Sequence, residues 1–365
     1  MATGFAESYI KLWSLNGDKL TGLRTDFDSD EVTDGAKLKG LRERDGPATR
    51  KLIGHSGPVY SLSFDPTPGP AAPPKYLLSS SLDSTVRLWS LDTYRNLVAY
   101  RAHREPVWST EWGPKGIYFA SGSRDRTARL WTTDRTSALR IFAGHLSDVN
   151  CVKFHPNSLY LATGSADRTC RLWDVQKGTC VRVFTGHKAG VSALAVSPDG
   201  RYLASGSHDS VIRLWDLGSG ALVKSLVGHA ASVHSLDFSN ESSVLVSGSA
   251  DCTVRIWDVN APVASDEDGA DEASGAALVP RQQQAGRRVS LLNGAYRDGP
   301  AGSGGSGKAG AYKGLDALSG AGAGGVGQGP SADLLETLVT KRTPVFNIKF
   351  TPRNLALAAG PMISD

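Results

Sequence analysis

The chain has 365 residues, a formal net charge of +4 at pH 7 and 41 glycines, a composition that favours short strands joined by tight turns. Its basic residues are scattered, which argues against a dedicated nucleic-acid binder, and it contains neither a run of about 18 apolar residues nor an apolar signal region. The four cysteines lack metal-binding spacing, so we expect no metal ion or cofactor and interpret them as small buried residues of a protein from a reducing compartment.

The first predicted unit occupies residues 1–24. Residues 8–13 alternate between polar and apolar side chains and end in Trp13, which predicts a strand. Thr3 and Glu7 precede Trp13 by ten and six residues, and later tryptophans are preceded at the same spacings by a hydroxyl-bearing residue and an acidic residue. We interpret this unit as a partial repeat with up to three strands. Residues 25–50 are charged and irregular and are predicted to form a linker.

Residues 51–261 are predicted to hold five complete repeats with a period of 42 residues. Each repeat has a Trp, an Asp six residues before it and a Ser or Thr ten residues before it. A His lies 28 residues before the last four tryptophans but 34 residues before Trp89, because residues 66–74 include a six-residue insertion. In chain order these residues are Ser79, His55, Asp83 and Trp89; Ser121, His103, Asp125 and Trp131; Thr163, His145, Asp167 and Trp173; Ser205, His187, Asp209 and Trp215; Ser247, His229, Asp251 and Trp257.

The third of these repeats illustrates the predicted elements. Its apolar alternation and turn residues predict strands over residues 149–154, 159–165, 169–174 and 179–184. The turn of the second and third strands centres near Asp167, which would place Thr163 opposite Trp173 to within about one residue. Four short antiparallel strands make one unit of a repeated β architecture.

Two further segments follow the repeats. Residues 262–332 combine an acidic cluster, a basic stretch and a Gly/Ala/Ser run, a composition that predicts a disordered insertion. Residues 333–365 are interpreted as a partial last unit with strands over 344–350 and 355–359. In this unit Lys341 stands at the His position and Ala359 at the Ser position.

The fixed period, the Gly-His near the start of each repeat and the Trp near its end resemble the WD40 repeats of β-propellers. The resemblance implies an all-β propeller in which each Trp indole donates to the Ser or Thr hydroxyl, the hydroxyl meets the His, and the other His nitrogen meets the Asp. A Ser, His and Asp also occur in hydrolases, but a catalytic triad occurs once per site and this set recurs five times. We therefore predict structural tetrads, no catalytic residues and no enzymatic activity.

The strand count favours a seven-bladed ring whose first and last blades are incomplete. The five full repeats and the two end pieces supply 25 of the 28 strands of such a ring, and the missing inner strand of the first blade is expected upstream of Met1. The alternative is a six-bladed ring in which the two end pieces share one blade and leave one strand over.

The segments that link the repeats resemble subunit 5 of the general transcription factor TFIID. They include residues 54–60, 141–151, 154–158, 164–169, 343–345 and 353–360. The resemblance implies a nuclear, non-catalytic scaffold of TFIID, and of the SAGA coactivator, whose propeller docks histone-fold TBP-associated factors for initiation by RNA polymerase II. It implies protein partners, with no direct nucleic-acid, membrane or small-molecule ligand.

A different WD40 scaffold, such as a ubiquitin-ligase substrate receptor, is the alternative. One large class of receptors carries Arg two places after Trp-Asp, where this chain has Gln176, Gly218 and Asn260. Residues beside the Asp turns and at the starts of the first strands are expected to share one rim of the ring. Aromatic and Arg side chains there form the candidate partner surface: Tyr60, Trp108, Arg124, Arg126, Arg168, His208 and His234.

Overall fold

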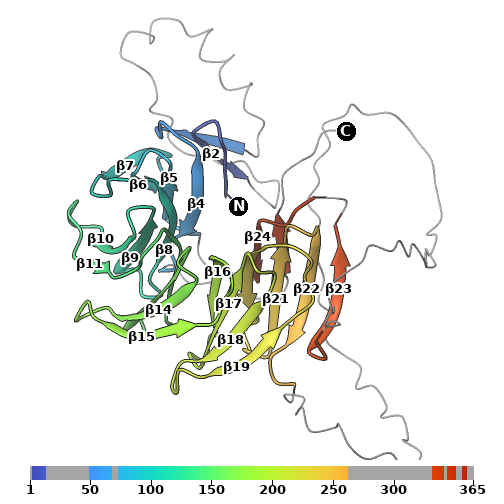
Figure 1. Cartoon of the computed structure of the whole chain (residues 1–365). Helices are drawn as coiled ribbons and strands as arrows, with labels where there is room; N and C mark the ends of the chain where they lie inside the picture. The colour runs from blue at the N-terminus through green and yellow to red at the C-terminus, as the bar shows by residue number, and fades with distance from the viewer. Residues whose placement is uncertain are drawn as a thin grey trace, which may run out of the picture.

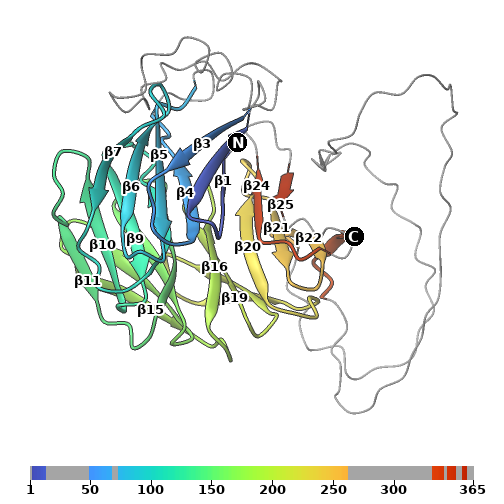
Figure 2. The same cartoon turned by 90° about the horizontal axis from the view of Figure 1, so that it is seen from above.

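The computed structural model describes residues 2–13, 49–67, 73–261, 331–340, 343–350 and 356–359. These residues form strands and turns arranged as seven antiparallel sheets, or blades, around a common centre (Figures 1 and 2). We number the blades 1 to 7 in chain order. No helix that could cross a membrane occurs in the described ranges.

Blades 2 to 6 each contain four strands, as the repeats predict. The first strand of each blade lies innermost, because it packs against the first strands of the neighbouring blades. From the innermost to the outermost, the strands are β4 (Val59–Phe64), β5 (Tyr76–Ser81), β6 (Val86–Ser90) and β7 (Asn96–Tyr100); β8 (Val107–Trp112), β9 (Tyr118–Ser123), β10 (Thr127–Thr132) and β11 (Arg140–Ala143); β12 (Val149–Phe154), β13 (Tyr160–Ser165), β14 (Thr169–Asp174) and β15 (Cys180–Thr185); β16 (Val191–Val196), β17 (Tyr202–Ser207), β18 (Ile212–Asp216) and β19 (Leu222–Leu226); β20 (Val233–Phe238), β21 (Val244–Ser249), β22 (Thr253–Asp258) and β23 (Leu334–Val339).

The two end pieces form separate sheets, which supports seven blades and contradicts the six-bladed alternative. Blade 1 contains β1 (Ala2–Gly4), β2 (Tyr9–Trp13) and β3 (Thr49–Ile53), and blade 7 contains β24 (Asn347–Phe350) and β25 (Ala356–Ala359). β1 packs beside β4, and β24 packs beside β20 and β21. Within the described residues, blade 1 therefore lacks an innermost strand and blade 7 lacks its two outer strands.

The outer strands of blades 1 and 6 correct two predicted boundaries. β3 begins within the segment predicted to be a linker, and β23 lies in the range assigned to the last unit, so the fifth repeat is not complete at residue 261. Residues 14–48 and 262–330 thus connect the third and fourth strands of their blades, and their predicted irregular structure lies outside the described residues. A blade tolerates such a connection because the entropy cost of closing a loop grows only logarithmically with its length.

The hydrophobic core is divided among the junctions between blades. One cluster joins Leu78, Leu88 and Tyr100 of blade 2 to Phe119 and Trp131 of blade 3, and similar clusters span the other junctions between blades that are consecutive in the chain. A single four-stranded unit cannot bury its faces alone, so the blades stabilise one another as neighbours.

The close approach of two blades also explains a repeated glycine. A Cβ atom on Gly206 of β17 would lie 2.7 Å from a methyl carbon of Val233 in the next blade. Only a residue without a side chain permits this contact.

Charged side chains meet at the centre of the ring. Four of the innermost strands carry a charged residue at the same position, four residues after a buried valine. These charged residues are Glu111, Lys153, Asp237 and Lys349. The Lys153 ammonium pairs with Glu111 at 2.5 Å, and Asp237 accepts the Phe350 N–H at 2.6 Å. Burial alone would lower the pKa of Lys153, but the carboxylates of Glu111 and Asp237 outweigh it and raise that pKa. The four charges thus interact across the centre as well as between neighbouring blades.

Lys224 holds both ends of the insertion in blade 6. Its ammonium lies in a buried position on β19, donates to the Ala261 carbonyl and pairs with the Asp333 carboxylate at 2.9 Å. The Ser331 N–H donates to Val227, and the Asp258 N–H donates to the Asp333 carbonyl. The chain therefore leaves and rejoins the blade at one place.

We predict that replacing residues 264–329 with a short Gly-Ser linker leaves the free energy of unfolding unchanged to within about 2 kcal/mol, because the ends already meet and loop length contributes little. Urea denaturation of the two chains tests this. The control deletion extends through Val339 and removes β23, and it should be strongly destabilising. A loss above about 2 kcal/mol from the shorter deletion alone would mean that the insertion packs on the ring.

Candidate functional site: the buried tetrads and the rim of the ring

A chain of hydrogen bonds crosses each complete blade. In blade 4 the Trp173 indole N–H donates to the Thr163 hydroxyl at 2.8 Å, and His145 Nε2 lies 2.7 Å from the same hydroxyl. His145 Nδ1 lies 2.8 Å from an Asp167 carboxylate oxygen. Because the indole can only donate, the hydroxyl donates to Nε2 and the Nδ1–H donates to Asp167, an arrangement that fits one neutral tautomer of His145.

The other four complete blades contain the same arrangement. The indole-to-hydroxyl distances are 2.8–2.9 Å and the Nε2-to-hydroxyl distances are 2.7–2.8 Å. The shortest Nδ1-to-carboxylate distance in each blade lies between 2.7 and 3.1 Å. The hydroxyl-bearing residues are fully buried in all five blades.

The strand register differs from the sequence prediction. Thr163 pairs with Arg171, and Trp173 pairs with Leu161, so Thr163 and Trp173 are two positions apart on the same face. The expectation that they lie opposite one another to within one residue was wrong by one position. The indole of Trp173 reaches the Thr163 hydroxyl across this diagonal pair of positions, a distance that an aromatic side chain on a sheet can span.

The aspartates fasten the turn between the second and third strands. One Asp167 oxygen accepts the backbone N–H and the hydroxyl of Thr169, and the other accepts His145 and the Leu146 N–H. Burial alone would raise the pKa of Asp167, but these hydrogen bonds outweigh it and lower the pKa to about 2. The same turn holds Arg168 at a φ of +70°, so the tetrad fixes a backbone conformation that L-residues rarely adopt.

The end blades keep only parts of the tetrad. The Trp13 indole N–H donates to the Thr3 hydroxyl at 2.9 Å in blade 1, at the spacing of the full repeats. The Lys11 ammonium lies 4.0 Å from the centre of a Trp13 ring. In blade 7 Ala359 ends β25, and Lys341 lies outside the described residues.

A repeated basic residue was missed in the sequence. An Arg lies two residues before each Trp of the full repeats, at the same period of 42, and Lys11 takes this place before Trp13. In blade 4 the Arg171 guanidinium covers Gly144, where a Cβ atom would lie 2.7 Å from Nη1. Gly228 and Arg255 show the same contact, which explains why Gly precedes these histidines. The spacing alone was enough to reveal the set: Arg87, Arg129, Arg171, Arg213 and Arg255.

The tetrads have the residue types of a hydrolase but not an accessible nucleophile. The Thr163 hydroxyl is buried and already accepts from an indole, so it cannot approach a substrate. No group of three potential metal ligands occurs among the residues that the structure describes. The geometry of the tetrads is that of a structural hydrogen-bond network, which gives partners to polar groups that are buried.

The candidate partner surface lies where the innermost strands begin. Tyr60, Trp108 and His234 each occupy a β-bulge, because the ladder skips the residue after the first valine of the strand. A bulge redirects a side chain out of the pleat. Tyr60 is 49% exposed and meets Trp108 edge to face at 4.8 Å between ring centres, and the Trp108 indole donates to Asp148 at 3.2 Å.

The other predicted surface residues are distributed around the ring. His208 lies 6.2 Å from His234, whose ring is 5.1 Å from that of Phe346, an exposed residue that sequence reasoning missed. Phe346 follows Val345 as Trp108 follows Val107, so its place in the repeat was the available signal. Three arginines at two of the Asp turns are exposed and make no ring contact with these aromatics: Arg124, Arg126 and Arg168. The structure therefore forms one aromatic pair and one group of three rings rather than one continuous cluster.

We predict that Asp167→Ala lowers the free energy of unfolding by about 1–3 kcal/mol, because it leaves a buried imidazole without an acceptor. Chemical denaturation against the unchanged chain measures the loss. Asp174→Ala is a control on a solvent-facing aspartate that serves only a local turn, and it should cost less. Equal stability of Asp167→Ala and the unchanged chain would contradict the structural role of the tetrad.

We predict that stability falls as the pH drops from about 7 to about 5. Burial lowers the pKa of His103, His145 and His229, although hydrogen bonds to their aspartates oppose this effect. Each imidazole therefore stays neutral in the folded chain at pH values just below about 6.5, the pKa of a histidine in the unfolded chain. The unfolded chain then binds more protons, which favours unfolding. The lowered aspartate pKa values add a second loss between about 4 and 2. Urea denaturation at pH 7.5 and pH 5 measures the first loss, and His145→Gln should reduce it; equal stability at the two pH values would be inconsistent with neutral buried histidines.

Comparison with known proteins identifies the repeats. The family described as "WD domain, G-beta repeat" matches residues 46–90, 95–132, 136–174, 178–216 and 220–258, more than half of the chain. The chain is 42% identical over 117 residues to "Transcription initiation factor TFIID subunit 5" of Encephalitozoon cuniculi and 49% identical over 105 residues to the protein of that name in Drosophila melanogaster. It is 43% identical over 100 residues to "SAGA complex/transcription factor TFIID complex subunit Taf5" of Schizosaccharomyces pombe.

These matches cover 31%, 28% and 27% of this chain and 19%, 14% and 12% of the respective relatives. The chain thus spans a small part of proteins that are much longer. Its resemblance to TFIID subunit 5, first indicated by the segments between repeats, is confirmed. With five matched repeats and seven sheets around one centre, the chain belongs to the WD40 repeat family.

Proposed function

We propose that the chain is a non-catalytic, nuclear scaffold of the transcription machinery whose propeller docks protein subunits of a TFIID-type complex. The similarity of its WD40 region to three proteins named as TFIID subunits carries this proposal. A propeller suits such a role, because rigid blades present loops at both ends of the ring to several partners.

Within that role, histone-fold TBP-associated factors are the proposed partners, and initiation by RNA polymerase II is the proposed process. The Schizosaccharomyces pombe relative carries SAGA as well as TFIID in its name, so we extend the proposal to a SAGA-type complex. Scaffolding also agrees with the chemistry of the tetrads, whose hydroxyls are buried and engaged.

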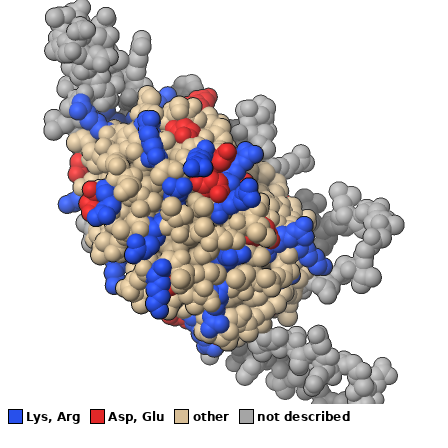
Figure 3. Space-filling model, turned by 60° about the vertical axis from the view of Figure 1, so that its left-hand side comes forward, with Lys and Arg blue, Asp and Glu red and all other residues tan. Residues whose placement is uncertain are grey.

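The proposed docking surface is the rim at the starts of the innermost strands. Tyr60 with Trp108, and His234 with Phe346, present paired aromatic rings there. Aromatic and Arg side chains supply most of the binding energy at many protein interfaces. The surface view in Figure 3 shows Lys and Arg side chains spread over the face displayed, with fewer acidic ones, and not gathered in one stripe of the kind that nucleic-acid binders carry.

We predict that Trp108→Ala weakens binding to a purified heterodimer of histone-fold TBP-associated factors by about tenfold or more, the scale of an interface hot spot. Titration calorimetry with the full chain measures the affinity. Tyr76→Ala is the matched control, because Tyr76 is exposed at the other end of a strand.

The same titration separates the possible outcomes. Binding by the unchanged chain that Trp108→Ala does not weaken would place the interface elsewhere on the ring. Failure to bind any histone-fold pair, together with capture of a ubiquitin-ligase adaptor, would contradict the proposed function.

A further inference from the structure

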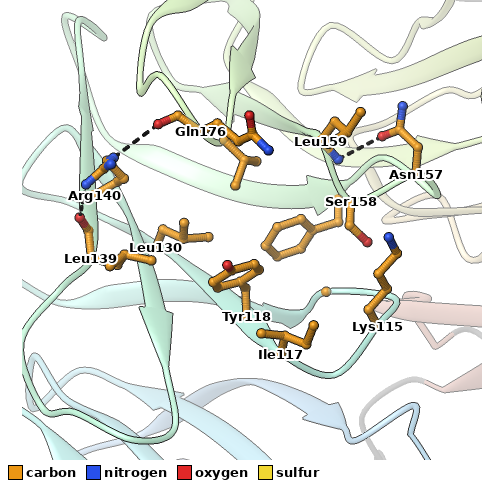
Figure 4. Close-up of a pocket in the computed structure, with 13 residues that line it drawn as sticks. Lys115, Ile117, Tyr118, Leu130, Leu139, Arg140, Asn157, Ser158, Leu159 and Gln176 are labelled. Carbon is orange, nitrogen blue, oxygen red and sulfur yellow. Dashed lines mark hydrogen bonds between the residues drawn. The ribbon is translucent and has the colours of Figure 1, made fainter.

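A cleft opens between blades 3 and 4, at the end of the strands opposite the Tyr60 and Trp108 rim (Figure 4). It measures about 340 Å³, which is enough for one large side chain and its flanking backbone. β9 and β12 contribute to it through Tyr118, where β9 begins, and Phe154, where β12 ends.

The floor of the cleft is apolar. Leu130, Phe154 and Val175 are buried members of the core cluster at this junction, and Tyr118 and Leu139 pack against them. At the mouth, Ile117 is 56% exposed and Leu159 is 47% exposed. Exposed aliphatic side chains beside an apolar floor are typical of a binding groove.

A residue difference distinguishes this open junction from the filled one between blades 4 and 5. The position of Gly113 corresponds, one period later, to His155, whose Nε2 lies 2.9 Å from the Gly200 carbonyl of blade 5. The His155 ring fills that junction so closely that a Cβ atom on Gly200 would lie 2.6 Å from it. At Gly113 there is no such ring, and the nearest side chain to its Cβ position is Phe154 at 3.7 Å.

One polar group in the cleft lacks a partner. The Ser158 hydroxyl is buried and makes no hydrogen bond with any residue that the structure describes. Ser158 corresponds to Gly200, so the neighbouring junction has no hydroxyl there. Because the hydroxyl oxygen is also shielded from solvent, it belongs to the wall of the cleft and is not exposed to a ligand there.

The charges of the lining are all positive. In Figure 4, Lys115 and Arg140 stand at opposite ends of the cleft, and no acidic residue lines it. Arg140 donates to the Gln176 carbonyl at 3.3 Å and to the Leu139 carbonyl at 3.0 Å. These bonds hold the guanidinium at the edge of the cleft, and its other N–H groups remain available to a carboxylate.

We propose that this cleft binds a short acidic segment of a partner protein, with one aromatic or large aliphatic side chain against the Phe154 floor. Carboxylates on either side of that side chain pair with Lys115 and Arg140. This surface is separate from the rim proposed for histone-fold partners, so the two proposals can be tested independently.

The test uses a fluorescein-labelled synthetic peptide with one tryptophan flanked on each side by two aspartates. Fluorescence polarisation with the full chain should show saturable binding with a Kd below about 100 µM. A peptide with alanine in place of the tryptophan, and a peptide with lysines in place of the aspartates, should each bind at least tenfold more weakly.

Three substitutions locate the binding. Gly113→His introduces the ring that fills the next junction and should abolish binding, while Lys115→Glu and Arg140→Glu should each weaken it at least tenfold. Lys188→Glu, an exposed charge reversal at the opposite end of the ring, should leave it unchanged. Thermal melting checks that Gly113→His folds. If it does not fold, Lys115→Glu and Arg140→Glu provide the test. The proposal would be overturned if the unchanged chain showed no saturable binding, or if Lys115→Glu and Arg140→Glu both bound the peptide as tightly as the unchanged chain.

Discussion

Each of the five complete blades depends on one hydroxyl group that accepts a hydrogen bond from an indole and donates one to an imidazole. In blade 4 this is Thr163, and the bonds continue through His145 to Asp167 and from there to the backbone of the turn. The chain of bonds links the loop before the first strand, the second strand, the turn and the third strand. Because every member is buried and paired, loss of one leaves others unsatisfied, and the blade behaves as a unit.

The blades are in turn stabilised by the junctions between them. The core clusters lie across these junctions, so most of the apolar burial of a blade requires its neighbours. This division leaves the ends of the strands free for recognition. One end carries the bulged aromatic residues, and the other carries loops whose small differences open or fill the clefts, as Gly113 and His155 show. Both proposed binding surfaces arise where the repeat tolerates variation.

The sequence predicted the blades well because the tetrad needs the same residue types at the same spacings in every copy. It misplaced the outer strands of blades 1 and 6, since pairing of β23 with β22 depends on alternating strand residues and not on the length of chain between them. The Thr163 register was missed because residue spacing around a turn does not determine which pairs are directly opposite. The cleft could not be predicted, because its emptiness depends on residues from two blades meeting at one junction.

The charges at the centre of the ring have a consequence for assembly of the fold. Repeats as similar as these face a danger during folding, because a strand can join the wrong neighbour when the alternatives are nearly equal in energy. Glu111 beside Lys153, and Asp237 beside Lys349, make neighbouring innermost strands electrostatically distinct from one another. Lys153 and Lys349 already repel one another, since Lys153 lowers the pKa of Lys349. A swap that separated either lysine from its carboxylate would leave this repulsion without a counter-charge, a cost that the apolar positions of the repeat cannot impose. The central charges therefore distinguish neighbouring innermost strands that the hydrophobic pattern alone leaves alike.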